Sequence, residues 1–344
     1  MEVRHARASE RDQVLDLLAR WFDQREFFAR YNLNDPAFRD ELCLVALEAG
    51  RIVSTAQIFD REVNLGGQAV ALGGIGSVYT LAEYRKRGVA SALMRLSVDT
   101  MEREGFELSL LFAERLDFYG GFGWSSERRI FSILPNAQQL PMDDDLTIEP
   151  LDPDRDLPEV SAIYASYSGR FDLTAVRDRS YWRGNLCYAG NPAEYFVVCR
   201  SHSRNGRIAA YARAIRFYGF PMIMEYGYRP DGLPAMLATF GHIANSADRL
   251  APEYFLDRGG SDPEGRSFDS VIPVTHSAHD PQLESALAAA GCPAAHHEDR
   301  SSMWRVISAE RLGRRFDLAP AAAVDKVMAM VRNPGSLYWS SDRF

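Results

Sequence analysis

One stretch of the sequence carries most of the information about the fold: residues 69–91, AVALGGIGSVYTLAEYRKRGVAS. Its first part, Ala69 to Tyr79, is apolar and predicts a strand that is unusually rich in glycine. The following residues lead into Val89–Glu104, where apolar side chains recur at helical spacing and predict an amphipathic helix. The stretch therefore predicts a strand, a loop and a helix in that order.

The loop between this strand and this helix has the properties of an anion-binding site. It contains Arg85, Lys86 and Arg87, followed by Gly88. The first turn of a helix presents N–H groups without intrahelical partners at the positive end of the helix dipole, and a glycine lets a ligand approach them. A solvated basic turn is the alternative interpretation. The sequence contains neither G-x-G-x-x-G nor G-x-x-x-x-G-K-[ST], which excludes a Rossmann fingerprint and a P-loop.

The flanking residues extend this motif into a first unit of residues 1–137. Upstream, a short strand, a helix with Val14 and Leu18 on its apolar face, and a hairpin at Leu42–Phe59 are predicted. Downstream, strands are predicted at Glu107–Ala113 and Ile130–Leu134, with a glycine-rich turn between them.

A similar rhythm returns later in the chain. Residues 138–158 are rich in Asp, Pro and Gln and are interpreted as a linker, and residues 159–312 again alternate helices and strands, with a last strand at Met303–Ile307. Residues 313–344 hold one helix and an aromatic tail. The predicted fold class is α/β (α+β): two similar units with mixed, mostly antiparallel sheets flanked by helices.

Composition and charge narrow the class of function. The 344 residues are 46% apolar and carry a formal net charge of −8, which argues against nucleic acid and anionic membranes as partners and favours a cationic small molecule. The sequence has no apolar run long enough to span a membrane and no signal-peptide pattern. Its four cysteines lack a paired spacing, which argues against disulfides or a thiolate metal site. We expect a cytoplasmic protein.

Two motifs together resemble the GNAT acetyltransferases. The first is the Arg85-x-x-Gly88-x-Ala90 loop, and the second is the Tyr119-Gly120-Gly121-Phe122-Gly123-Trp124 segment one strand later. The resemblance implies a GNAT fold that uses acetyl-CoA as co-substrate and no metal. It also places the coenzyme pyrophosphate on the loop.

The layout of two such units with an apolar C-terminus resembles the enhanced intracellular survival (Eis) family of amine N-acetyltransferases. That resemblance implies a homo-oligomer and assigns the coenzyme contacts by position. Only about 40 residues follow Met303, too few for the sterol-carrier-like third domain of that family. The implied contacts are Val78, Tyr79 and Thr80 for pantetheine, Arg85, Lys86, Arg87, Gly88, Val89, Ala90 and Ser91 for pyrophosphate, and Glu114 and Arg115 after the fifth strand.

The same resemblance supplies catalytic roles. Amine acetylation needs a group that accepts the amine proton and a group that protonates the departing thiolate. Tyr119 falls at the position of the proton donor, with a buried structural tyrosine as the alternative. The carboxylate of Phe344 falls at the position of the base, if the tail returns to the active site; a surface-packed tail is the alternative. Glu114 and His5 are further candidates.

The acceptor site is expected near the end of the first helix. Trp21, Asp23, Glu26 and Phe27 combine aromatic faces with carboxylates, a mixture that suits a cationic amine. The alternative is that the aromatics belong to the core and the acids to solvent.

Two segments of the second unit are interpreted as non-functional. Tyr228–Leu233 stands where a coenzyme loop would be, but its proline removes an N–H donor and the motif spacing is lost, so we predict no coenzyme there. The adjacent His296 and His297 cannot readily share one face, and no further ligands complete a metal site.

These observations predict an acetyl-CoA-dependent N-acetyltransferase that acts directly on a primary amine of a cationic small molecule, such as an aminoglycoside-like or other natural-product amine. Two alternatives stay open. One is a synthase that acetylates a single dedicated metabolite. The other is a non-catalytic module that binds acyl-CoA.

Overall fold

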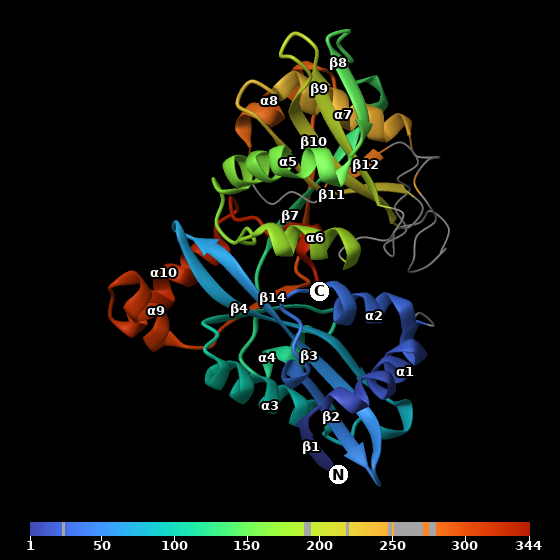
Figure 1. Cartoon of the computed structure of the whole chain (residues 1–344). Coiled ribbons are helices and arrows are strands. Elements are labelled where there is room, and N and C mark those ends of the chain that lie inside the picture. Colours follow the sequence, from blue (N-terminus) through green and yellow to red (C-terminus); the bar gives the residue numbers. More distant parts are fainter. Residues whose placement is uncertain (23–24, 189–193, 218–219, 247–249, 251–270, 275–279) are drawn as a thin grey trace.

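The chain folds into two units, and its C-terminus lies between them (Figure 1). The computed structural model describes residues 1–22, 25–188, 194–217, 220–246, 250, 271–274 and 280–344. Each unit is built on a seven-stranded sheet, so the predicted class of mixed, mostly antiparallel sheets flanked by helices is confirmed. Among the helices of these residues, none has the length and apolar character that a membrane crossing needs.

The first sheet has the strand order β1-β2-β3-β4-β5-β14-β6. Neighbouring strands are antiparallel except β4 and β5, which run parallel. A parallel pair needs a crossover connection, and α3 supplies it. The elements are β1 Glu2–His5, β2 Cys43–Glu48, β3 Arg51–Leu65, β4 Gln68–Thr80, α3 Val89–Glu104, β5 Leu108–Phe112, β6 Ser125–Ser126 and β14 Ser302–Val306.

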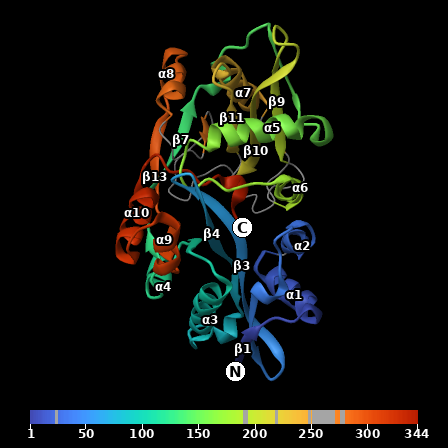
Figure 2. The same ribbon diagram turned by 60° about the vertical axis from the view of Figure 1, so that its left-hand side comes forward.

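Different helices cover the two faces of the first sheet (Figure 2). On one face lies α3, so close that a Cβ added at Gly73 would be 2.4 Å from Met101 Sδ. On the other face lie α1 (Arg11–Phe22) and α2 (Arg25–Asn34), where Tyr31 of α2 meets Phe59 of β3 with ring centroids 5.2 Å apart. Because side chains alternate along a strand, Gly74 faces the α2 side.

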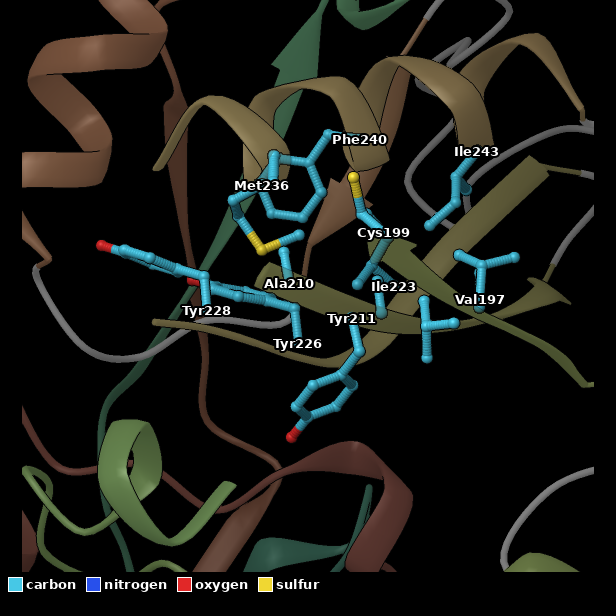
Figure 3. Packing of buried hydrophobic residues seen from close by; sticks show 14 of the residues in the cluster. Val197, Cys199, Ala210, Tyr211, Ile223, Tyr226, Tyr228, Met236, Phe240 and Ile243 are labelled. Atoms are coloured by element: carbon cyan, nitrogen blue, oxygen red, sulfur yellow. The ribbon is translucent and has the colours of Figure 1, made fainter. Parts of the chain in front are cut away.

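The second sheet has the strand order β13-β7-β12-β11-β10-β9-β8. Its strands β9, β10 and β11 and the helix α7 enclose a core that includes Val197, Ala210, Ile223 and Phe240 (Figure 3). The elements are β7 Arg129–Pro135, β8 Leu146–Pro150, α5 Pro153–Ser168, α6 Arg179–Tyr188, β9 Tyr195–Ser201, β10 Arg207–Phe217, β11 Phe220–Tyr228, α7 Leu233–Asn245, β12 Val271–Val274, α8 Pro281–Ala289 and β13 Ala295–Asp299.

The two units exchange strands, which the sequence did not predict. The strand expected to end the first unit, β7, pairs with β12 and β13 in the second sheet. The strand expected in the second unit, β14, pairs with β5 and β6 in the first sheet. Unit boundaries at 137 and 312 therefore do not separate the sheets. Local periodicity identifies a short strand but not its partner, because partner choice depends on tertiary packing.

The segment interpreted as a linker, residues 138–158, is ordered. It contains β8 and the first turns of α5. The Asp and Pro residues that suggested a linker are helix-start signals instead: the Asp152 side chain accepts hydrogen bonds from the backbone N–H groups of Asp154 and Arg155, and Pro153 occupies the first turn.

The C-terminal segment returns to the first unit. After α9 (Ala309–Phe316) and α10 (Pro320–Arg332), residues 337–342 are buried. The Phe344 ring stacks on Phe59 of β3 with centroids 5.2 Å apart. The aromatic tail is therefore packed inside the protein, between the two sheets.

Candidate functional site

The candidate site lies where β4 and β5 separate. The two strands pair from Leu72 opposite Leu108 to Ile75 opposite Leu111. Beyond this point β5 ends, whereas β4 continues to Thr80, with a register shift against β3 and a positive φ of 51° at Ser77. Among the described residues, no strand therefore pairs with the β5 side of this end of β4, and its backbone groups there are available to an extended ligand.

The predicted pyrophosphate loop opens the first turn of α3. Gly88 is the N-cap with φ 79°, and no side chain caps the helix. A Cβ added at Gly88 would meet nothing within 4 Å. The first-turn donors of Val89, Ala90 and Ser91 are thus left to an outside ligand.

The basic side chains of the loop remain at the surface. Arg85 donates from Nε to the carbonyl of Thr80 at 3.1 Å, and the Arg87 guanidinium lies 5.1 Å from the centre of the Tyr84 ring. Lys86, with a positive φ of 60°, is exposed like both arginines. This arrangement fits a diphosphate held by backbone N–H groups and screened by exposed cations.

The other predicted coenzyme residues flank the opening. Val78, Tyr79 and Thr80 are half-buried on the free end of β4, and the Thr80 hydroxyl lies 2.6 Å from that of Ser54. Glu114 and Arg115 follow β5 and are exposed.

Tyr119 lies on α4 (Leu116–Gly120), directly after β5. Its ring packs edge-on against Phe118, and among the described residues no group hydrogen-bonds its hydroxyl. Burial raises the pKa of Tyr119, with a smaller opposing effect from Arg115. The hydroxyl therefore stays protonated at neutral pH and can donate a proton.

The glycines of β4 make room for Phe344. A Cβ at Gly74 would lie 2.3 Å from the Phe344 ring, and a Cβ at Gly76 would lie 3.1 Å from the backbone carbonyl oxygen of Phe344. The backbone carbonyl group of Phe344 is therefore beside β4 at the opening, on the face opposite α3. Phe112, the last residue of β5, contacts the Phe344 ring at 6.0 Å between centroids and precedes α4 by a few residues.

A buried ionic cluster of the second unit holds the tail in this position. Asp342 and Glu225 both lie 2.7 Å from Arg177 Nη2, and all three side chains are fully buried. Arg213 is 3.3 Å from Glu225, and the Ser341 hydroxyl donates to the same carboxylate. Arg177 and Arg213 hold the pKa of Glu225 well below its usual range despite its burial. Glu225 is thus ionised at neutral pH.

Hydrogen bonds add to this anchor. Tyr181 donates to Asp342 at 2.9 Å, Asn185 donates to the Ser341 carbonyl at 2.9 Å, and the Trp339 indole donates to Ser168 at 3.0 Å. Sequence analysis missed the anchor. Its one local signal is Glu225, a carboxylate in an otherwise apolar strand.

The predicted acceptor residues are only partly described. Asp23 lies outside the described residues, and the side chain of Trp21 is not described either. Glu26 is exposed. Phe27 packs edge-on against Phe28 and Tyr31, with centroids 5.3 and 5.9 Å apart, and belongs to the aromatic cluster around Phe344.

A pocket adjoins this cluster between α1, α2 and β3. Tyr31, Phe59, Gln57, Arg11 and Ser77 are among its lining residues. It lies on the same face of the sheet as Phe344, because Phe59 stacks on the Phe344 ring. An acceptor entering from this side would meet β4 from the face opposite α3.

His5 lies away from this site. Its ring is hydrogen-bonded to the Glu41 carbonyl and lies beside Thr100. Thr100 is about 16 Å along α3 from the first turn, at a rise of about 1.5 Å per residue. His5 is therefore not a base at the opening.

The two histidines of the second unit point apart. His296 lies 3.0 Å from the Ser132 hydroxyl and 3.3 Å from Glu284, whereas His297 stacks on Phe131. Within the part of the chain that the structure describes, no three His, Cys, Asp or Glu side chains converge as metal ligands would.

Comparison with known proteins agrees with this geometry. Residues 2–126 match the model of the acetyltransferase (GNAT) domain. That segment contains β4, β5, the α3 loop and Tyr119, whereas Phe344 lies outside it. This segment of the first unit is therefore similar to a GNAT acetyltransferase domain.

Relatives and solved structures extend the comparison. An uncharacterized N-acetyltransferase of Streptomyces avermitilis is 38% identical over 73 residues, but the match spans only 21% of this chain and 18% of that protein. A probable N-acyltransferase of Enterococcus faecalis V583 has a TM-score of 0.66 at 16% identity and covers 89% of this chain and 72% of that one. Eis1 of Mycobacterium abscessus has a TM-score of 0.57 at 15% identity, and the match covers 89% of this chain and 74% of that one. At these identities the solved structures establish a shared fold.

Proposed function

We propose that the protein is an acetyl-CoA-dependent N-acetyltransferase that acetylates a primary amine of a small molecule in a ternary complex. The observation that carries this proposal is the juxtaposition at the end of β4. An uncapped helix N-terminus with a φ of 79° at Gly88 lies on one side, and the backbone carbonyl group of Phe344 lies beside Gly76 on the opposite face.

The residues fit the coenzyme in an extended conformation. The backbone N–H groups of residues 88–91 would hold the pyrophosphate, and the side chains of Arg85, Lys86 and Arg87 would place positive charge beside it. The free edge of Val78, Tyr79 and Thr80 would hydrogen-bond the pantetheine, and Glu114 and Arg115 lie at its border. Acetyl-CoA supplies the activated acetyl group.

The proton transfers would be carried out by a carboxylate and a hydroxyl group. The Phe344 carboxylate would accept a proton from the amine, directly or through a water molecule, which makes the amine a nucleophile. The Tyr119 hydroxyl would donate a proton to the departing sulfur. Because burial raises the pKa of Tyr119, the hydroxyl carries its proton before the transfer.

The second unit has the same local topology as the first. β11, α7 and β12 repeat the order of β4, α3 and β5, and β11 and β12 are again parallel. This repeat supports a tandem GNAT arrangement of the Eis type. The acceptor that the net charge of −8 favours is a cationic natural-product amine, such as an aminoglycoside-like compound.

The test is thiol release from acetyl-CoA with a panel of aminoglycosides, polyamines and a lysine peptide. Tyr119→Phe should lower kcat about a hundredfold or more, because it removes a general acid, with coenzyme affinity unchanged. Tyr195→Phe is the matched control, since it removes a hydroxyl of the second unit that bonds His242.

Equal turnover by Tyr119→Phe and the unaltered protein would refute the role of Tyr119. Coenzyme binding without turnover on any amine would favour a binding module. Turnover on one amine alone would favour a synthase for a dedicated metabolite.

A further inference from the structure

Two half-buried arginines near the tail differ from the arginines whose side chains are fully buried in the described chain. Arg61, Arg177 and Arg213 each have a carboxylate within 2.7 Å of a guanidinium nitrogen. Arg129 and Arg343 have none: within the described residues, neither side chain makes an ion pair or a hydrogen bond. Arg129 Nη2 and Arg343 Nε are both buried without a partner.

Aromatic rings are the groups that contact these two guanidinium groups among the described residues. Arg343 Cζ lies 4.3 Å from the centre of the Phe112 ring, and Arg129 Cζ lies 5.9 Å from that of Trp304. Tyr338 joins the two rings, at 6.2 Å from Phe112 and 6.4 Å from Trp304 between centroids. Both guanidinium groups therefore lie against one cluster of aromatic rings, formed by Phe112, Tyr338 and Trp304.

Among the described residues, Asp299 is an acidic neighbour of both arginines, and its charge partly opposes the lowering of their pKa values. It stands opposite Arg129 in the register of β13 and β7, but its carboxylate hydrogen-bonds the backbone and hydroxyl of Ser301 and makes no ion pair with either arginine. Burial and then the neighbouring charge of Arg343 lower the pKa of Arg129 to about 10, and burial also lowers the pKa of Arg343. A guanidinium group that is partly withdrawn from water without a counter-ion is destabilising, and an anionic ligand would supply the missing partner.

The location of Arg129 and Arg343 indicates whether the bound anion would belong to the coenzyme or to the acceptor. Phe112 ends β5 at the opening, and its ring contacts that of Phe344, which lies on the face opposite α3. The coenzyme phosphates belong to the α3 loop at the other side. The face that carries Arg129 and Arg343 is the face from which the acceptor would approach.

We propose that Arg129 and Arg343 form an anion site for the acceptor, so that the preferred substrate is a primary amine that also carries a carboxylate or a phosphate. This inference rests on the proposed transfer to a primary amine, and it assigns that amine an anionic group in place of the purely cationic acceptor that the net charge favours. A simple polycation would lack the group that the two arginines bind.

The test compares acceptors that differ only in the anion. Thiol release is measured with ω-aminoalkanoates of increasing length, the matching ω-aminoalkyl phosphates and the unsubstituted alkylamines. One charge-assisted contact corresponds to about tenfold or more in kcat/KM, so the best anionic acceptor should exceed its alkylamine by this factor. Whether the carboxylate or the phosphate series gives this factor identifies the anion.

Arg129→Gln should remove the preference for anionic acceptors and leave the rate with the alkylamine unchanged. Arg129→Lys keeps a positive charge and should keep part of this preference, which distinguishes loss of the anion contact from misfolding. Arg128→Gln is the control, because Arg128 is exposed and paired with Glu298 at 3.0 Å. Equal kcat/KM for anionic and plain amines in the unaltered protein, or a preference that survives in Arg129→Gln, would overturn the proposal.

A binding measurement separates this inference from the proposed function. With coenzyme A saturating the α3 loop, inorganic phosphate should raise the Tm of the unaltered protein and of Arg128→Gln, but not of Arg129→Gln. If no amine is acetylated but this pattern holds, the anion site stands and the proposed function fails. If amines are acetylated and phosphate shifts no Tm, the anion site is refuted and the function stands.

Discussion

The loops that begin α3 and α7 occupy the same place in their units but differ in what they can bind. Before α3, Gly88 has a φ of 79° and open space where a Cβ would be. Before α7, a Cβ at Gly232 would lie 2.3 Å from the Ala209 carbonyl oxygen, and Pro234 occupies the first turn. The one loop is open to a ligand, whereas the other is packed against its own backbone.

The charges of the two loops differ in the same way. Arg229 before α7 is tied to Glu159 at 2.8 Å and to the Ile208 carbonyl at 2.7 Å. Arg87 before α3 is exposed. The comparison indicates that the shared topology alone does not give the two loops the same function. Ligand binding also needs backbone N–H donors that are free and open space beside them. The second unit instead uses its buried charges to hold the tail.

The largest expected effect comes from breaking that anchor. Arg177→Met leaves Glu225 and Asp342 buried without their shared cation, which should lower the free energy of unfolding by about 3–5 kcal/mol. Urea unfolding monitored by fluorescence measures this change. Arg204→Met is the control, because Arg204 pairs with Asp231 at the surface, and should change stability by less than about 1 kcal/mol. Equal effects of the two substitutions would show that the cluster is not an anchor.

Gly88 and Gly232 provide the next test, because substituting them should have different effects on coenzyme affinity. Gly232→Ala should destabilise the protein by about 1–3 kcal/mol through overpacking, with coenzyme affinity unchanged. Gly88→Ala should cost about 1–2 kcal/mol in backbone strain at positive φ and weaken coenzyme binding about tenfold, because the methyl group stands where the phosphate would approach. Titration calorimetry and urea unfolding measure both quantities. Weaker coenzyme binding by Gly232→Ala would contradict the distinction between the loops.

The smallest effect is the acid sensitivity of the anchor. Since the folded chain holds the pKa of Glu225 below its ordinary value, Glu225 contributes stability above the unfolded pKa of about 4.3 and loses it as the pH falls toward the folded value. The free energy of unfolding should therefore decrease below about pH 4. Urea unfolding across this range should show a shallower decrease for Glu225→Gln. Identical slopes would mean that Glu225 does not titrate with unfolding.

The sequence predicted what depends on neighbouring residues. The glycine-rich strand, the loop at Arg85–Ser91 and the following helix are local signals, and the structure places them as predicted. The glycines Gly74 and Gly76 have a further reason that only the fold reveals: they leave room for Phe344, more than 260 residues later in the chain.

What the sequence could not predict depends on distant partners. The exchange of β7 and β14 joins strands from opposite ends of the chain. The pairing of Arg177 with Glu225 and Asp342 needs three segments to meet, and no local pattern distinguishes these residues from surface charges. The absent partners of Arg129 and Arg343 are likewise visible only when the neighbours are known.

The two units should divide their roles, so that one binds coenzyme and the other holds the tail. Titration calorimetry of the intact protein with acetyl-CoA measures this division. One coenzyme should bind per chain, with binding weakened by Gly88→Ala and unchanged by Gly232→Ala. Two coenzymes per chain, or one whose binding responds to Gly232→Ala alone, would contradict it.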